Sequence, residues 1–141
     1  MKNFTLLFFS LLLLGLPCNA GAPSDSPDKA AEKFYAGYLA VLNANKDTVS
    51  WVAKSKVVTA DFKKSYAKVM SPKGNESIDV EPVLQAQDTP TTPFKAGKPM
   101  IKGNKATVIL TARFGVDTGK VSVRMVLANG LWLVDSVRST K

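Results

Sequence analysis

The polar side chains best placed to bind a ligand lie in the C-terminal half of the chain. Gln85 and Gln87 stand at alternate positions, so in a strand their amides would share one face, with Asp88 at its end. Arg113 and Arg124 fall in two later apolar runs that we expect to be neighbouring strands, where two guanidinium groups could bind an anion. These five residues form the predicted ligand-binding site.

Each group also has a purely structural interpretation. The amides and the acid could satisfy backbone groups at a strand end. The two arginines could lie on a solvated outer face, with Arg124 paired to Asp135 across a hairpin. Both interpretations stay open at the level of the sequence.

Catalytic groups are scarce. The chain has no histidine, which removes the commonest general base and a usual zinc ligand. Its single cysteine, Cys18, lies in an N-terminal segment that we expect to be cleaved off, so the mature chain would have no thiol nucleophile. It shows no nucleophile elbow, phosphate loop or calcium loop. We therefore expect no enzyme, no metal and no cofactor; the alternative is a small isomerase-like or hydrolase-like enzyme that uses a buried acid such as Asp88.

The first 22 residues have the pattern of a signal peptide. Lys2 precedes an almost unbroken run of Leu and Phe over 4–16, shorter than the roughly 20 residues that span a bilayer. Small residues suit cleavage after Ala20 or Ala22. We predict a removed signal over 1–22, a flexible leader over 23–27 and one domain over 28–141, in a bacterial protein that is periplasmic or secreted.

Cys18 could instead be the lipidated residue of a lipoprotein. Pro17 stands immediately before it, where a lipidation motif needs a small residue, and Gly15 stands where the motif needs leucine. We therefore do not expect a lipid anchor.

The charge balance suggests anionic partners. The formal net charge is +8, and removal of the signal takes only Lys2 among the charged residues. Outside the cytoplasm we expect no nucleic acid, but a small ligand or an envelope protein. Scattered lysines could form a membrane-facing or wall-facing patch, or a merely solubilising surface: Lys54, Lys56, Lys63, Lys64, Lys68 and Lys73.

Three helices are expected first. Ser26 and Pro27 favour a helix start, and apolar residues recur at helical spacing up to 43–45. Asp47 could cap a short second helix, and Thr59 a third that runs to about Met70. The segment 71–75 should stop helical structure.

Strands should follow, over 79–87, 99–102, 105–114, 120–127 and 131–138. Asn129-Gly130 is the preferred two-residue hairpin turn, because both residues must take positive φ. Counting outward places Leu127 opposite Trp132, and Arg124 opposite Asp135. The last strands are apolar on one whole face and half apolar on the other, which favours a curved sheet wrapped around a helix.

This order of elements resembles the nuclear-transport-factor-2-like, or cystatin-like, α+β roll. Within it the chain is similar to small secreted bacterial proteins of unknown function, over about 28–138. The likeness lies in Ala31-Glu32-Lys33-Phe34-Tyr35, in the segment 82–88 and in the terminal strand 130–137. It implies an α+β fold in which N-terminal helices pack in the concave face of a curved, mainly antiparallel sheet.

The function that we expect is noncatalytic binding. The chain would bind a small ligand in the cone, the space enclosed between the curved sheet and the helix, or another protein across the open face of the sheet. The same open face could also form a homodimer. The alternative is an immunity or inhibitor protein that neutralises an envelope-directed toxin or enzyme. A cone plugged by large apolar side chains would argue against ligand binding and catalysis inside it.

Overall fold

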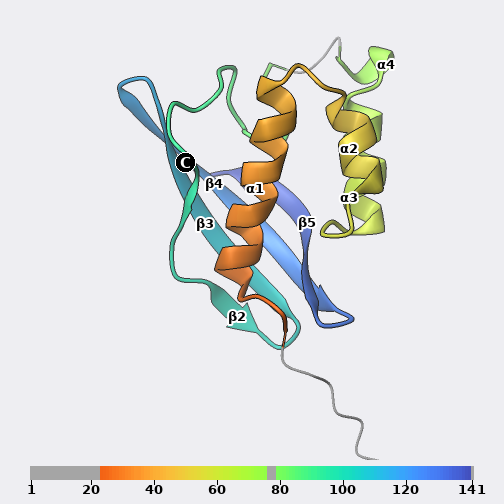
Figure 1. Ribbon diagram of the computed structural model, residues 1–141, viewed down its shortest axis with the longest axis vertical. Helices are drawn as coiled ribbons and strands as arrows, with labels where there is room; N and C mark the ends of the chain where they lie inside the picture. The colour runs from red at the N-terminus through yellow and green to blue at the C-terminus, as the bar shows by residue number, and fades with distance from the viewer. Residues whose placement is uncertain (1–22, 76–78, 141) are drawn as a thin grey trace, which may run out of the picture.

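The computed structural model describes residues 23–75 and 79–140 (Figure 1). The predicted signal peptide over 1–22 lies outside the described residues. The elements follow in the order α1 (Pro27–Asn43), α2 (Thr48–Lys54), α3 (Ala60–Val69), α4 (Pro72–Asn75), β1 (Lys95–Ala96), β2 (Met100–Lys102), β3 (Lys105–Phe114), β4 (Asp117–Ala128) and β5 (Leu131–Ser139).

The strands form one curved antiparallel sheet in the order β1-β3-β4-β5, and β2 also pairs with the outer edge of β3. Helix α1 lies along the concave face, while α2 and α3 lie beside β5 (Figure 1). The opposite face of the sheet has no helix of the described chain on it. The predicted α+β fold, with helices packed in the concave face of a cystatin-like roll, is confirmed.

Local capping signals locate two of the helices. The Asp47 carboxylate accepts from the Ser50 N–H (3.1 Å) at the start of α2, and the Thr59 hydroxyl accepts from the Phe62 N–H (3.1 Å) at the start of α3. Helix α1 begins at Pro27 as predicted, but the Ser26 side chain makes no capping bond there. Helix α4 is a single turn in the segment that we expected to end helical structure.

The predicted register of the β4–β5 hairpin is correct near the turn and wrong at the far end. Asn129 and Gly130 have φ of 51° and 74°, and the predicted pairs hold as far as Met125 with Val134. A β-bulge then adds Asp135 as an extra residue, so Arg124 pairs with Ser136 instead. The predicted register opposite Arg124 is therefore shifted by one.

Contacts with the segment before α3 accompany this bulge. The Val134 N–H donates to the Val57 carbonyl (2.9 Å), and the Thr59 N–H donates to the Val134 carbonyl (2.9 Å). The Thr59 hydroxyl donates to Asp135 Oδ1 (3.1 Å). The outer edge of β5 is thus paired to the start of α3 where the bulge begins.

The predicted strand over 79–87 is wrong. The segment is a tight turn in which the Gln85 N–H donates to the Glu81 carbonyl (2.8 Å) and Gln85 has φ of 54°. Val83 and Leu84 are both buried, which a strand covered on one face only cannot achieve with consecutive residues. Their apolar character suggested a strand, whereas the structure buries them at the end of a loop. The short strand β1 was not predicted.

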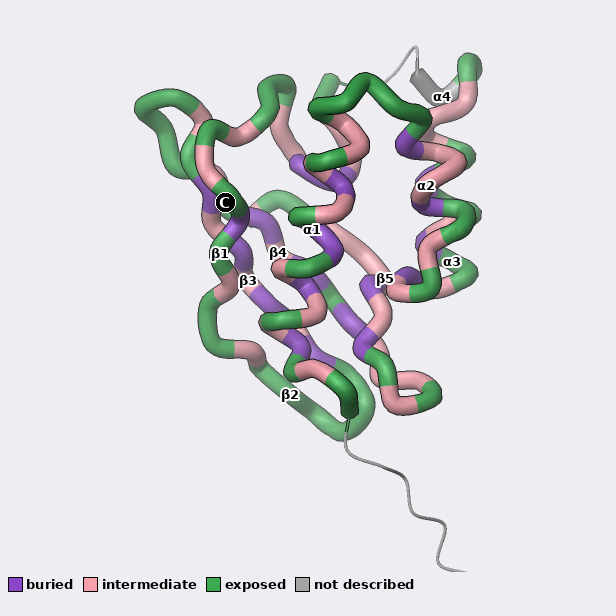
Figure 2. Tube along the Cα trace, viewed as in Figure 1, coloured by how far each residue is buried: buried purple, intermediate pink, exposed green. Residues whose placement is uncertain are grey.

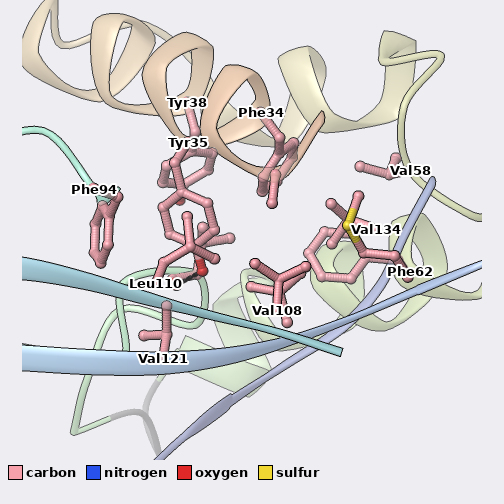
Figure 3. Packing of buried hydrophobic residues seen from close by; sticks show 14 of the residues in the cluster. Phe34, Tyr35, Tyr38, Val58, Phe62, Phe94, Val108, Leu110, Val121 and Val134 are labelled. Atoms are coloured by element: carbon pink, nitrogen blue, oxygen red, sulfur yellow. Dashed lines mark hydrogen bonds between the residues drawn. The ribbon is translucent and has the colours of Figure 1, made fainter. Parts of the chain in front are cut away.

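The core lies between α1 and the concave face of the sheet. Buried positions of α1 face the strands, and the exposed ones face outward (Figure 2). Tyr35 packs on Phe94 with ring centroids 4.4 Å apart, above Leu110 (Figure 3). The wholly apolar face predicted for the last hairpin faces the core: Val123, Met125, Trp132 and Val134 are buried, and Leu127 is half-buried.

Thr59→Ala should lower the free energy of unfolding by about 1–2 kcal/mol, because it removes the α3 cap and the donor to Asp135 together. Thr59→Ser keeps the hydroxyl and should retain most of that stability. Urea denaturation followed by circular dichroism measures both variants. Equal losses in the two would show that the methyl group, and not the hydroxyl, matters.

Candidate binding surface

The interior of the roll is filled with side chains. Phe34, Tyr35 and Tyr38 of α1 are at most 1% exposed, and their rings contact one another and neighbouring aromatic rings. The Tyr35 hydroxyl donates to the Val83 carbonyl (2.8 Å) and so ties α1 to the 81–86 turn. These rings occupy the space between α1 and the sheet in which the small ligand was expected.

A polar network closes the end of this core. The Tyr38 hydroxyl donates to Glu81 Oε1 (2.5 Å) and lies 2.7 Å from the Tyr66 hydroxyl, which donates to Thr48 Oγ1 (2.9 Å). Glu81 Oε2 accepts from the Val83 and Leu84 N–H groups (2.9 and 2.5 Å). One carboxylate thereby joins α1 to the 81–86 turn, with α2 and α3 linked through the hydroxyls.

The tyrosines of this network are held as neutral hydrogen-bonding groups. Burial raises the pKa of Tyr35, Tyr38 and Tyr66, and the Glu81 carboxylate raises that of Tyr38 further. A tyrosine with a raised pKa is a poor general base at neutral pH. We assign the network to the stability of the roll.

Of the three predicted polar residues of 85–88, Gln85 is bound to backbone. Its side-chain amide donates to the Pro82 carbonyl (2.6 Å) and accepts from the Ser139 N–H (3.2 Å). It also lines a shallow hollow of about 190 Å³ between α3 and β5. Gln87 and Asp88 are exposed on the following loop. These residues lie on a loop rather than on a strand face.

Arg113 and Arg124 lie on the outer, convex face of the sheet. They stand on neighbouring strands, as predicted, at opposite ends of the β3–β4 ladder: Arg124 pairs with Thr107, and Arg113 with Thr118. Arg113 is exposed, and its backbone is bonded to Thr91 and Thr92. Arg124 Nη2 lies 3.6 Å from Asp135 Oδ2, so the expected ion pair forms although the register is shifted.

The outer face is strongly basic. Alternation along the strands and the pairing registers place seven exposed cations on it: Lys95, Lys102, Lys105, Arg113, Lys120, Arg124 and Arg138. Among the strand residues of the described chain, Asp135 is the acid that accompanies them, and Arg124 alone of the seven forms an ion pair. Half-buried Ile109, Val126 and Leu133 lie between the charges.

A hollow of about 310 Å³ lies in this face. Met100, Lys105, Thr107, Arg124 and Asp135 are among the residues that line it. An apolar centre with a charged, solvent-accessible rim is the usual composition of a protein–protein interface. We take this basic outer face as the candidate binding surface.

Most of its cations were missed from the sequence. Only Arg113 and Arg124 were selected, whereas Lys105 and Lys120 occupy the same alternating positions on the same strands. The alternation of side chains along these two strands could have identified both lysines from the sequence. Lys95 lies on a strand that was not predicted, and Arg138 reaches this face only because the bulge shifts its register.

The described residues offer little for metal-dependent chemistry. Within 23–75 and 79–140 no group of three or more His, Cys, Asp or Glu side chains could hold a metal ion. The carboxylate most closely enclosed by hydrogen bonds, Glu81, is taken up by Tyr38 and backbone N–H groups.

No protein-family model matches the chain, and no curated protein is similar to it in sequence. Solved structures are similar in fold. The crystal structure of the type VI native effector-immunity complex Tae3-Tai3 from Ralstonia pickettii contains a chain with TM-score 0.69 and 17% identity, over 84% of this chain and 98% of that chain. The selenomethionine form of that complex matches with TM-score 0.60 and 20% identity, over 82% and 98%. The likeness shows the fold.

Tyr38→Phe should lower the free energy of unfolding by about 1–3 kcal/mol, because it leaves the Glu81 carboxylate without its hydroxyl donor. Lys64→Ala, on the exposed side of α3, serves as the control and should change stability by less than about 0.5 kcal/mol. Denaturant unfolding measures both. A Tyr38→Phe variant as stable as the control would show that the Glu81 network does not hold the roll together.

Proposed function

We propose that this chain is a noncatalytic protein-binding module that binds an acidic protein partner through its basic outer face. The observation that carries the proposal is the contrast between the two faces of the sheet. The inner face is filled and covered by α1, whereas the outer face holds seven cations and one acid with no helix over it. Complementary charge speeds encounter and selects partners of opposite sign.

We further propose that the module acts as an immunity protein. The fold comparisons support this form, because the similar chains come from an effector-immunity complex. Of the two roles in such a complex, immunity requires binding alone. It suits a chain with no histidine and with its one cysteine, Cys18, in the predicted signal.

The other expected functions receive less support from the geometry. A ligand in the cone would have to displace the packed rings of Phe34, Tyr35 and Tyr38. An enzyme that uses Asp88 would rely on an exposed loop carboxylate instead of a buried acid. Binding of a protein over the outer face needs neither change.

The proposed compartment is the periplasm. It is supported by the signal-like run over 4–16. Among the residues that the structure describes, no helix is long and apolar enough to cross a membrane. A periplasmic immunity protein would meet its toxin where the toxin acts on the envelope.

The Lys120→Glu/Arg124→Glu variant should weaken binding to the partner by about 100-fold or more, because two attractive charges become repulsive. The partner to use is the product of a toxin or envelope-enzyme gene beside this one, and calorimetry at two salt concentrations measures the dissociation constant. Lys64→Glu/Lys68→Glu on α3 makes the same change in net charge and is the matched control.

The control variant should bind like the natural chain. Equal weakening of the two variants would mean that net charge, and not this face, governs binding, and would refute the proposed surface. For the immunity role, exported protein should protect cells from the periplasmic toxin, while protein without residues 1–22 should not. Protection by the unexported form would contradict the proposed compartment.

A further inference from the structure

Two lysines lie directly opposite each other at one end of the outer face. Lys102 of β2 pairs with Lys105 of β3, and both are exposed. Like charges at opposed positions of an antiparallel pair are destabilising. In the described sheet the other cations of this face lie opposite uncharged residues: Lys95, Arg113, Lys120, Arg124 and Arg138. The repulsive pair is therefore a local feature of one end of the face.

This pair lines the hollow of about 310 Å³ in the outer face, together with Arg124. The strand registers place Thr107 opposite both Met100 and Arg124, and all three residues line the same hollow. Because Thr107 is short and the side chains around it are long, the surface is depressed at this point. One concavity thus brings together three cationic side chains.

Arg124 can bind a further group in this hollow. Its side chain is 55% exposed, and Nη2 lies 3.6 Å from Asp135 Oδ2, a separation that is longer than a hydrogen bond. Asp135 in turn accepts from the Thr59 hydroxyl (3.1 Å). A guanidinium group can donate two parallel N–H groups to one carboxylate. With three cations and one acid on its wall, the hollow would offer a carboxylate a net positive charge.

The form of the hollow favours a side chain of a protein over a free small molecule. Sites for small molecules enclose most of the ligand and have volumes of about 300 Å³ or more. This hollow is at that lower limit, and Met100 on its wall is 65% exposed, so it would enclose a free molecule poorly. A side chain that projects from a partner needs less enclosure, because the partner's own surface covers the rim.

We propose that this hollow is the anchoring subsite of the outer face and binds the carboxylate of an Asp or Glu side chain of the acidic partner. The carboxylate accepts from Arg124 and lies beside the opposed Lys102 and Lys105, whose repulsion it relieves. The subsite rests on the protein-binding function proposed above and names the group that is bound. Cations at the other end of the face, such as Arg113 and Lys120, attract the partner without anchoring it.

The free chain provides the first test. Protein without residues 1–22 keeps every described residue, and in it Lys102→Gln should raise the urea midpoint at low salt, because the repulsion from Lys105 is removed. Lys120→Gln is the matched control: it removes a cation opposite Thr111, so it should raise the midpoint less, through net charge alone. A Lys102→Gln midpoint no higher than that of the control would overturn the proposal.

Citrate serves as a carboxylate probe in a second test. Titrated into the ¹⁵N-labelled chain, it should shift the backbone amide signals of Lys105, Thr107 and Arg124 more than those of Arg113 and Lys120. Equal shifts at the two ends would indicate attraction by the whole face and would contradict an anchoring subsite.

Binding to the partner provides the third test, by calorimetry with the product of the toxin or envelope-enzyme gene beside this one. Lys102→Gln/Arg124→Gln should weaken binding about 30-fold or more, as the loss of an interface hot spot does. Arg113→Gln/Lys120→Gln removes the same charge from the other end and should weaken it about threefold or less. Equal weakening by both variants would refute the subsite and leave the outer face as the binding surface. No weakening by either would refute the proposed function too.

Discussion

The Glu81 carboxylate is the polar contact on which the roll depends. It follows the segment that leads out of the helices, and it accepts from Tyr38 of α1 and from two backbone N–H groups of its own turn. That turn carries Val83 and Leu84 into the core and offers the Val83 carbonyl to Tyr35. A buried polar network of this kind stabilises only when every member is satisfied. With this network closed, α1 and the 81–86 turn are held against the concave face of the sheet.

The second constraint lies at Asp135. As the extra residue of the bulge it leaves the regular ladder, accepts from Thr59 at the start of α3, and lies near Arg124. The bulge joins the helical layer to the edge of the sheet. The bulge also places Arg138 opposite Ser122 and thereby on the outer face. One local irregularity therefore changes which charged side chains lie on that face.

The sequence predicted those parts of the fold that rest on local interactions. Asp47 and Thr59 cap their helices through groups only three residues away, and Asn129-Gly130 sets a turn through its own dihedral angles. Two of the differences from the prediction arise where residues distant in the sequence interact. The bulge at Asp135 accompanies a contact with Thr59, 76 residues apart, and the 79–87 segment turns because Glu81 meets Tyr38 of α1. Neither contact can be predicted from the residues next to Asp135 or Glu81 in the sequence.

The composition says only that the chain is basic, whereas the structure shows on which face its cations gather. Two lysines of α1 have acid partners, Glu32 for Lys29 and Asp25 for Lys33, whereas the outer face holds seven cations with one acid. Half-buried Ile109, Val126 and Leu133 lie among these cations, so a partner on this face would meet charged side chains around an apolar centre.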